Sequence, residues 1–378
     1  MVVGLMAGTS LDGIDVAVVE LRPRGPSYSV ELLRFQTIPY ERTLERRLRA
    51  ALPPQSASAR EVCELHADVG AAFGDAAASV AEGVEIAFAA SHGQTLYHCG
   101  RRAGRGGATL QIGDAFAIRE RVGVTVAYDF RSADCAAGGE GAPLVPYADA
   151  LLLRRPGLPR VALNLGGIAN LTLIPGDGGE VSAFDVGPGN LLLDELARTR
   201  LGQPFDRDGT AAARGRADTA LVERVLADPW FAQPPPKSTG RERFGAHALD
   251  GAWDALTAED ALATAVEITA RSVAAAIGRS GYESCDVLVS GGGVHNRVLL
   301  AAIARATAVE VRSSACAGID PDAKEAIAFA VLGYELLRGR PAGLPRVTGA
   351  VGPRLLGALA PQGLETLLAR VRAEVGAA

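Results

Sequence analysis

The apolar positions at the start of the chain form two short β-branched runs on either side of a turn rich in glycine and hydroxyl residues. The runs lie at 2–3 and 16–19, and the turn lies at 8–13. This pattern is typical of a strand, a tight turn and a second strand. Backbone N–H groups and hydroxyls in such a turn can bind a phosphate, although an isolated turn of this kind can also be a simple hairpin. The opening therefore predicts a β-hairpin and suggests nucleotide chemistry.

The same design of strand, glycine turn and strand returns about 160 residues later. Apolar runs at 161–165 and 168–174 flank a Gly-Gly turn at 166–167. A third glycine turn, at 291–293, follows the apolar run 287–289. Recurrence of one supersecondary unit is typical of a duplicated half. The chain is therefore expected to contain two related lobes.

Helical and strand-like stretches alternate between these turns. A run at 84–90 predicts a strand, and its polar end at 91–95 is expected at a carboxyl edge, where ligands bind in α/β sheets. A second strand-like run at 122–127 precedes a charged segment at 129–134. The stretches of helical composition are 60–80, 261–277, 323–337 and 364–375. The alternation predicts an α/β fold.

The length of the chain favours more than one domain. Its 378 residues exceed the roughly 250–300 residues at which a single core usually stops growing. We expect an N-terminal lobe at 1–142, a C-terminal lobe at 143–345 and a tail at 346–378 that can pack back on the first lobe. Two lobes predict a ligand cleft between them.

Composition and charge exclude several classes of partner. The net charge of −5 gives no reason to expect nucleic acid, and no apolar run approaches the roughly 20 residues that a bilayer requires. Five scattered cysteines without a C-x-x-C pair indicate a reducing compartment and no cysteine-bound metal. No signal peptide is recognisable at the N-terminus. We therefore expect a cytoplasmic protein with no membrane or nucleic-acid partner.

The three glycine turns resemble, in order and spacing, those of the superfamily of actin, hexokinase and the heat-shock chaperone ATPases. Two hairpins of that superfamily hold the phosphates of ATP, and a third loop lies against adenosine. The resemblance implies two actin-like (ribonuclease H-like) lobes, each with a mixed sheet flanked by helices. Met6 and Asn164 stand where many members carry Asp, which disfavours a generic chaperone or actin-type ATPase.

Further segments resemble the anhydro-N-acetylmuramic acid kinase family, in that family's order and over nearly the whole chain. These segments are 8–15, 91–95, 129–131, 138–146, 184–190, 205–209 and 237–244. Ala7 stands where Ser is frequent in the family, a small change that leaves the turn intact. The resemblance implies a kinase that uses ATP and Mg²⁺ to convert 1,6-anhydro-N-acetylmuramic acid, a cell-wall recycling product, into N-acetylmuramic acid 6-phosphate. It also implies a homodimer.

The resemblance assigns the nucleotide to the three glycine turns. The residues implied are Gly8, Thr9, Ser10, Leu11, Asp12, Gly13, Asp15, Gly166, Gly167, Gly291, Gly292, Gly293 and Asn296. Asp12 is the candidate for holding Mg²⁺ through water, and stabilisation of the turn is the alternative role of its carboxylate.

Asp185 is the candidate catalytic base implied by the resemblance. It lies where a strand-like run meets an open Gly/Pro turn, so its carboxylate can project from rigid backbone. The structural alternative is an Asx-turn or an N-cap for a helix that begins near Leu191. Residues 239–242 match the capping box S/T-x-x-E, so the segment from Lys237 is either a helix entry or a loop near the ligand.

The resemblance assigns the sugar to His92, Gln94, Asp129, Arg131 and Glu325. A His at a strand end can instead be a satisfied structural residue. Arg131 can pair with the lactyl carboxylate of a muramic substrate, or internally with Asp129 or Asp134. Glu325 can bind substrate or stabilise the first turn of a helix through the helix dipole.

Two rival functions share these features. One is a kinase of another anhydrosugar, such as levoglucosan. The other is an ATP-gated sugar sensor that binds its ligands without turnover.

Overall fold

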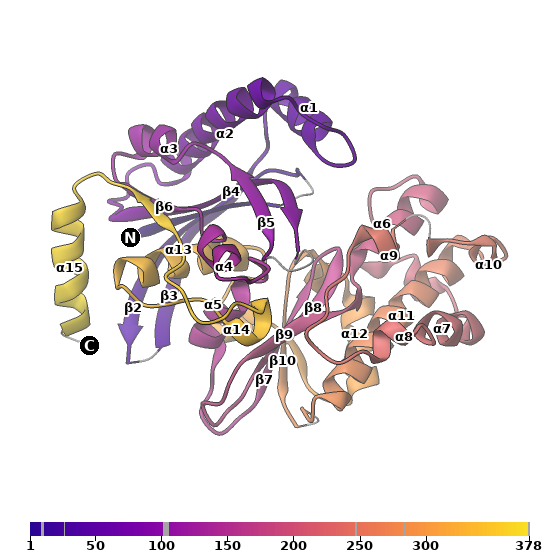
Figure 1. Cartoon of the computed structure of the whole chain (residues 1–378). Helices are drawn as coiled ribbons and strands as arrows, with labels where there is room; N and C mark the ends of the chain where they lie inside the picture. The colour runs from indigo at the N-terminus through magenta and orange to yellow at the C-terminus, as the bar shows by residue number, and fades with distance from the viewer. Residues whose placement is uncertain (9–10, 26, 101–105, 246–247, 283, 377–378) are drawn as a thin grey trace. The chain divides into compact units, whose positions relative to one another are not determined.

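The computed structural model divides the chain into two compact units. It describes all residues except 9–10, 26, 101–105, 246–247, 283 and 377–378. Unit 1 combines Met1–Leu152 with Ala323–Ala378, and unit 2 is the continuous stretch Leu153–Asp322. Figure 1 shows the elements of both.

Unit 1 is built on a seven-stranded mixed sheet in the order β12-β6-β4-β1-β2-β3, with β5 paired to β4. Strands β1, β4 and β6 are parallel to one another, and β2 and β3 continue the sheet antiparallel to β1. The strands are β1 (Val2–Ala7), β2 (Ile14–Arg24), β3 (Ser27–Ile38), β4 (Phe88–Cys99), β5 (Ala108–Ile112), β6 (Thr125–Tyr128) and β12 (Ala358–Ala360).

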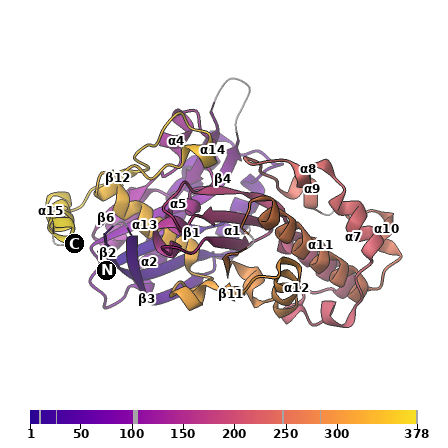
Figure 2. The same ribbon diagram turned by 90° about the horizontal axis from the view of Figure 1, so that it is seen from below.

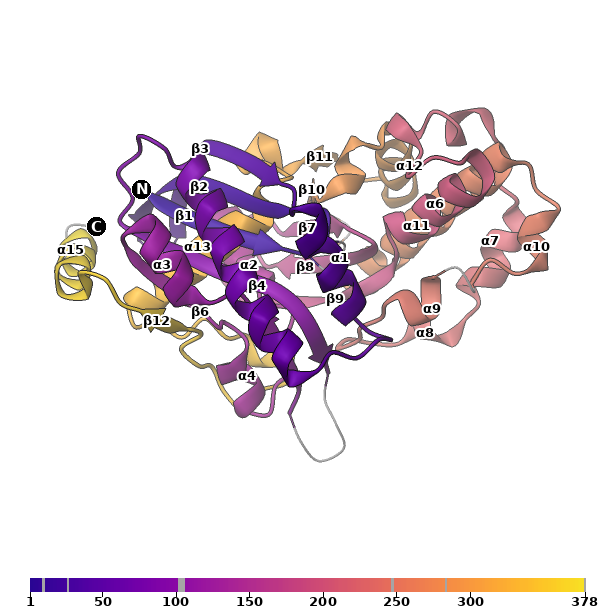
Figure 3. The same cartoon turned by 90° about the horizontal axis from the view of Figure 1, so that it is seen from above.

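Helices cover both faces of this sheet. Figure 3 shows α1, α2 and α3 over one face, where they enclose a core that includes Leu5, Phe73 and Ile118. Helix α13 packs against β1 and β4 on the other face. The helices of unit 1 are α1 (Arg42–Ala51), α2 (Ala59–Val80), α3 (Ala115–Val122), α4 (Ser132–Ala136), α5 (Val145–Leu153), α13 (Lys324–Leu337), α14 (Pro345–Thr348) and α15 (Leu364–Gly376).

Unit 2 repeats this strand order on a smaller scale. Its five-stranded sheet runs β11-β10-β7-β8-β9, with β7, β10 and β11 parallel and β8 and β9 antiparallel to their neighbours. The strands are β7 (Arg160–Leu165), β8 (Ile168–Ile174), β9 (Ser182–Pro188), β10 (Asp286–Ser290) and β11 (Val311–Ser313). The order matches β6-β4-β1-β2-β3 of unit 1, so the predicted α/β fold of two actin-like halves with mixed sheets is confirmed.

The core of unit 2 lies between its sheet and α11, which packs beside α12 (Figure 2). The helices are α6 (Asn190–Leu196), α7 (Thr219–Leu226), α8 (Pro229–Ala232), α9 (Arg241–Phe244), α10 (Gly251–Asp254), α11 (Ala258–Arg279) and α12 (Arg297–Thr307). Helix α11 is long and apolar enough to cross a membrane by length and composition, with a mean hydropathy of 1.3 over its most apolar window. Because 67% of that window is buried inside the fold, α11 is accounted for as a core helix.

The division into units differs from the predicted boundaries after residues 142 and 345. Helix α13 belongs to unit 1 because it packs on β1, where Gly4 leaves no space for a Cβ against the carbonyl oxygen of Ala326. The tail also lies in unit 1, since β12 pairs with β6. Unit 1 therefore needs both ends of the chain.

Two strands have different bounds in the structure from those predicted from the sequence. Strand β4 begins at Phe88 and continues past the polar segment 91–95 to Cys99, because its residues from Gln94 onward pair with β5. The run predicted at 122–127 forms β6 only from Thr125, since Val122 ends α3.

Candidate active site

Several predicted site residues of unit 1 meet at one edge of its sheet. The parallel strands β1, β4 and β6 bring Gly8, His92 and Arg131 to this edge. Helix α13 runs antiparallel to them, because Ala326 near its start contacts Gly4 and Gly333 near its end contacts Phe88. The helix N-terminus with Glu325 therefore lies at the same edge. Carboxyl ends of parallel strands are the usual ligand edge of α/β sheets.

His92 is buried, and both of its ring nitrogens are used inside unit 1. Its Nε2 lies 3.0 Å from Nε of Arg131, and its Nδ1 lies 2.9 Å from the carbonyl oxygen of Gly93. An arginine only donates, so Nε2 accepts and Nδ1 carries the proton. Burial, aided by the charge of Arg131, lowers the pKa of His92 well below its usual value. His92 is therefore a neutral residue that orients Arg131.

Arg131 is held by neutral partners. Besides His92, its Nη1 donates to the carbonyl oxygen of Gly141 at 2.7 Å. Burial lowers the pKa of Arg131 to about 10, and the charge of Glu325 opposes this effect. The described residues contain no ion pair between Arg131 and either of the two carboxylates considered from the sequence. Asp129 accepts instead from the hydroxyl of Ser132 at 2.6 Å.

Asp129 stabilises the start of α4. Its backbone has a φ of 54°, a left-handed conformation that Asp tolerates better than most residues. Its Oδ1 also accepts from the N–H of Ser132 at 3.4 Å. The contacts of Asp129 are those of a turn residue.

Glu325 lies in the first turn of α13 and faces other charged groups. Burial raises its pKa, while the charges of Lys324 and Arg131 act in the opposite direction. Lys324 itself forms a buried ion pair with Asp149 at 2.9 Å. The edge thus combines a carboxyl group and a guanidinium in one polar cluster.

Gln94 forms a hydrogen bond to the start of the first glycine turn. It is completely buried, and its Nε2 donates to the carbonyl oxygen of Gly8 at 3.1 Å. Its Oε1 accepts from the hydroxyl of Tyr40 at 2.9 Å. Burial, together with the charge of Asp12, raises the pKa of Tyr40, which keeps this hydroxyl a donor. Tyr40 had no sequence signal, because only the fold brings it to Gln94.

The turn between β1 and β2 is shaped by tight backbone contacts. Leu11 is buried with a φ of 60°, and a Cβ on Gly13 would lie 2.8 Å from the carbonyl oxygen of Ile38. Asp12 is exposed, whereas Asp15 points its carboxylate to the hydroxyl of Thr37 at 2.6 Å. The predicted phosphate contacts Thr9 and Ser10 lie outside the described residues.

In unit 2 the second glycine turn holds the start of α6. The backbone N–H groups of Gly189 and Asn190 donate to the carbonyl oxygens of Gly167 and Gly166 at 2.9 and 2.8 Å. The side chain of Asn190 donates to the carbonyl oxygen of Leu165 at 2.8 Å. Turn and helix are therefore one rigid structure.

The third glycine turn packs directly on the second hairpin. A Cβ on Gly291 would lie 2.7 Å from Oδ1 of Asn164, and one on Gly293 would lie 2.5 Å from Cβ of Leu165. Only glycine permits this approach. Asn296 follows as the N-cap of α12, and its Oδ1 accepts from the N–H of Leu299 at 3.0 Å. The predicted nucleotide residues of unit 2 are thus brought together.

Asp185 lies on the edge strand β9 and is partly exposed. Its N–H donates to the carbonyl oxygen of Lys237 at 3.1 Å, and its Oδ2 accepts from the N–H of Thr239 at 2.8 Å. The alternative role as an N-cap is not observed, since α6 is capped by Gly189 without a side-chain bond. One carboxylate oxygen is therefore held by a main-chain N–H, and the residue is partly exposed.

The segment 237–239 contacts Asp185 and leads into α9, which begins at Arg241. The hydroxyl of Thr239 is buried and has no hydrogen-bond partner among the described atoms. A cavity of about 630 Å³ borders the segment, with Trp230, Gln233 and Arg243 in its wall. A buried, unpaired hydroxyl beside a carboxylate suits a ligand site.

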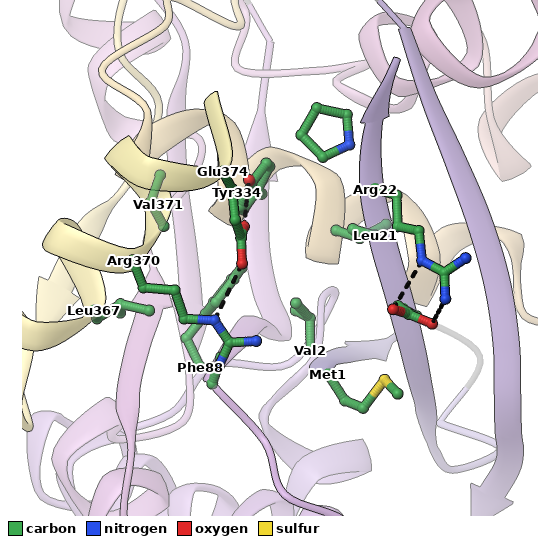
Figure 4. Close-up of a pocket in the computed structure, with 13 residues that line it drawn as sticks. Met1, Val2, Leu21, Arg22, Phe88, Tyr334, Leu367, Arg370, Val371 and Glu374 are labelled. Atoms are coloured by element: carbon green, nitrogen blue, oxygen red, sulfur yellow. Dashed lines mark hydrogen bonds and ion pairs between the residues drawn. The ribbon is translucent and has the colours of Figure 1, made fainter. Parts of the chain in front are cut away.

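A second cavity, of about 480 Å³, lies at the opposite edge of the unit 1 sheet, where β1 and β4 begin. Figure 4 shows Val2, Phe88, Leu367 and Val371 in its walls, with Arg370 bonded to Glu374 at 3.1 Å. None of the predicted site residues lines it. It is distinct from the polar edge described above.

Comparisons with known proteins agree with the motifs. The family model for anhydro-N-acetylmuramic acid kinase matches residues 1–362. A protein of that name from Xanthomonas campestris pv. campestris (strain 8004) is 50% identical over 371 residues, covering 95% of this chain and 96% of the relative. One from Gloeobacter violaceus is 44% identical over 380 residues, covering 96% and 99%.

Among solved structures, a ROK family glucokinase from Streptomyces griseus, in complex with glucose and AMPPNP, aligns with a TM-score of 0.38 at 12% identity. The alignment covers 87% of this chain and 97% of the glucokinase. The family match and the close relatives confirm the resemblance inferred from the sequence: the chain belongs to the anhydro-N-acetylmuramic acid kinase family.

Proposed function

We propose that this protein uses ATP to open 1,6-anhydro-N-acetylmuramic acid and to phosphorylate its O6, giving N-acetylmuramic acid 6-phosphate in the cytoplasm. The observation that carries the proposal is the geometry of Asp185 in a chain of this family. Its Oδ2 accepts from the N–H of Thr239 and the residue is partly exposed, so a water molecule can come within hydrogen-bond reach of the carboxylate, as a general base requires.

Asp185 takes a proton from water while the water oxygen bonds to C1 of the sugar. The C1–O6 bond breaks, O6 bonds to the γ-phosphorus of ATP, and ADP leaves. Inverting glycosidases need an acid to protonate the departing oxygen. In this reaction the phosphoryl group takes the place of that proton, so one carboxylate suffices.

We assign ATP to the glycine turns of both units. Gly8 to Gly13 would bind phosphates in unit 1, and Gly166–Gly167 would do so in unit 2, through backbone N–H groups. The loop at 291–293 and Asn296 would lie against the nucleoside. The hydrogen bond from Gln94 to Gly8, and the close packing of Gly291 beside Asn164, support this assignment because they hold these two glycines in place without a ligand.

Asp12 would hold Mg²⁺ through water. Its carboxylate is exposed next to the first glycine turn, and oxygen ligands suit this cation. When bound, Mg²⁺ neutralises charge on the phosphates during phosphoryl transfer.

Arg131 and Glu325 are the proposed substrate contacts of unit 1. His92 and Gly141 bind Nε and Nη1 of Arg131, which leaves Nη2 to donate to the lactyl carboxylate. Glu325 would bind a sugar hydroxyl. We propose that His92, Gln94 and Asp129 position the substrate-binding residues, since their hydrogen bonds are made to other residues of unit 1.

Turnover of competing sugars tests the proposal. We expect ADP release and phosphosugar formation with 1,6-anhydro-N-acetylmuramic acid, and a much lower kcat/KM with levoglucosan, which lacks the lactyl group. Arg131→Ala should remove most of this preference. A higher kcat/KM with levoglucosan would support the rival kinase, and binding of both ligands without ADP release would support the sensor.

The family resemblance also predicts a homodimer. Light scattering coupled to size-exclusion chromatography measures its mass directly, and a monomeric mass at micromolar concentration would contradict this part of the proposal.

A further inference from the structure

Lys237 lies beside Asp185 and has no part in the reaction as written above. Its carbonyl oxygen accepts from the N–H of Asp185 at 3.1 Å. Two residues later, the N–H of Thr239 donates to Oδ2 of Asp185 at 2.8 Å. The segment 237–239 therefore fixes both the main chain and the carboxylate of Asp185.

The side chain of Lys237 anchors this segment to α8. Its Nζ donates to the carbonyl oxygens of Trp230 and Phe231 at 3.2 and 3.0 Å. The same ammonium lies 4.3 Å from the centroid of the Trp230 ring. A cation bonded to the last carbonyls of a helix and placed over an aromatic face has few other positions available.

The support beneath Lys237 is itself rigid. Trp230, Phe231 and Phe244 form a buried aromatic cluster, with the Trp230 ring 5.3 Å from that of Phe231 and 5.7 Å from that of Phe244. Arg279 of α11 donates to the carbonyl oxygen of Phe231 at 2.7 Å. The position of the ammonium is thus fixed by the core of unit 2.

The ammonium also acts on Asp185 through its charge. Burial, with a smaller contribution from the charge of Arg279, lowers the pKa of Lys237 to about 8, and the charge of Asp185 opposes this effect. The charged groups around the ammonium are thus Arg279 on α11 and Asp185 on β9. The ion pair of Asp228 with Arg243, at 2.5 Å, lies in the wall of the same cavity. A nearby cation favours the ionised form of a carboxylate.

We propose that Lys237 is a positioning residue for Asp185: its ammonium, tied to α8 and the Trp230 ring, holds residues 237–239 against β9 and favours the ionised, correctly oriented carboxylate. This inference rests on the proposed function, in which Asp185 is the base.

The test compares Lys237→Met, Lys237→Arg and the control Arg224→Met in the full-length protein. Arg224 of α7 pairs with Asp250 at 2.9 Å on the exposed surface of unit 2 and does not line the cavity beside residues 237–239. For K237M we expect kcat to fall by up to about 100-fold, as misplacement of a catalytic group by about 1 Å can cause. KM for ATP should stay within about twofold. K237R and R224M should retain kcat within about threefold.

The pH profile separates positioning from a merely structural role. Loss of the Lys237 charge disfavours ionised Asp185, so the acidic limb of kcat should move to higher pH in K237M by about half a pH unit or more. K237R should restore the wild-type limb. Equal losses in K237M and K237R with an unmoved limb, or wild-type kinetics in K237M, would overturn the proposal.

A measurement without substrate keeps this inference separate from the proposed function. The ¹³C carboxyl resonance of Asp185, followed by NMR titration of the folded proteins, should show a higher pKa in K237M than in wild type and R224M. An unchanged titration overturns the role of Lys237. Absence of sugar turnover by the wild type, with the shift present, overturns only the proposed function.

Discussion

At the scale of single residues, hydrogen bonds to main-chain groups orient the side chains proposed to act in catalysis and binding. Asp185 is held by the N–H of Thr239, Gln94 binds the carbonyl oxygen of Gly8, and Arg131 binds that of Gly141. Backbone partners have fixed positions, so a side chain bonded to them loses little further freedom on meeting a ligand.

Asp185→Asn should abolish most turnover and leave nucleotide binding intact. The amide can still accept from the N–H of Thr239 but cannot take a proton from water. We expect kcat to fall by about 10²- to 10⁴-fold, the usual contribution of a general base. Steady-state kinetics and calorimetric titration with a non-hydrolysable ATP analogue measure the two effects. The exposed Asp177→Asn serves as control, and a D185N enzyme with more than half the wild-type kcat would rule out the base.

His92 should make the protein less stable in mild acid. It stays neutral in the fold, because its pKa is well below the usual value, whereas the unfolded chain takes up a proton below a pH of about 6.5. The unfolded state then binds more protons, so stability falls as pH decreases through this window. Between pH 7 and 5.5 the expected loss is about 1 kcal/mol. Urea denaturation should show this loss in wild type but not in His92→Gln, and equal losses in both would contradict it.

Some of these residues were predictable and others were not. The glycine turns carry local signals, since their residue types and spacing encode a conformation. Asp185 was identified through the family resemblance of its segment. The bond between His92 and Arg131, and the bond between Tyr40 and Gln94, join residues far apart in sequence. Such contacts arise from packing, which a single sequence does not display.

At the scale of elements, glycine residues permit the tight turns between strands and the close packing of helices on strands. The duplicated hairpins β1–β2 and β7–β8 could be predicted because each has a glycine turn between β-branched runs. The length of β4 could not be predicted, because its second half, from Gln94 to Cys99, pairs with β5, a partner that the sequence pattern does not show. Helix boundaries followed the sequence closely, as in α2 and α11, where periodicity and capping agree.

Gly4→Ala should destabilise unit 1. The new Cβ would collide with the carbonyl oxygen of Ala326, and neither β1 nor α13 can move without disturbing the core. Overpacking of this kind costs about 3 kcal/mol. The transition of unit 1 should then fall by roughly 6–12 °C in calorimetry. Gly278→Ala, whose Cβ would meet nothing within 4 Å, is the matched control and should not lower the transition. Equal melting of G4A and wild type would contradict the contact.

At the scale of the whole molecule, the two units differ in how the chain builds them. Unit 2 is one continuous stretch with its own core, whereas unit 1 needs α13 and β12 from the C-terminal end. The duplication was predictable from the repeated hairpin. The assignment of α13 to unit 1 could not be predicted, because the apolar residues of a helix do not show which sheet the helix covers.

The fragment 153–322 should therefore fold alone, and the fragment 1–322 should contain a folded unit 2 and an unfolded unit 1. Removal of α13 exposes one face of β1 and β4, and this loss of apolar burial exceeds what a unit of this size can tolerate. Circular dichroism melts and the dispersion of ¹H–¹⁵N spectra measure both results. A cooperative unit 1 transition in the fragment 1–322 would contradict the role of α13.

The central claim is that water attacks C1 while O6 takes the phosphoryl group. Mass spectrometry of the product formed from ATP, Mg²⁺ and 1,6-anhydro-N-acetylmuramic acid in H₂¹⁸O tests it most directly, with unlabelled product incubated in parallel to correct for exchange at C1. The account predicts one heavy oxygen at C1, none in the phosphate, and the phosphate on O6. Heavy oxygen in released phosphate with the anhydro ring intact would contradict it.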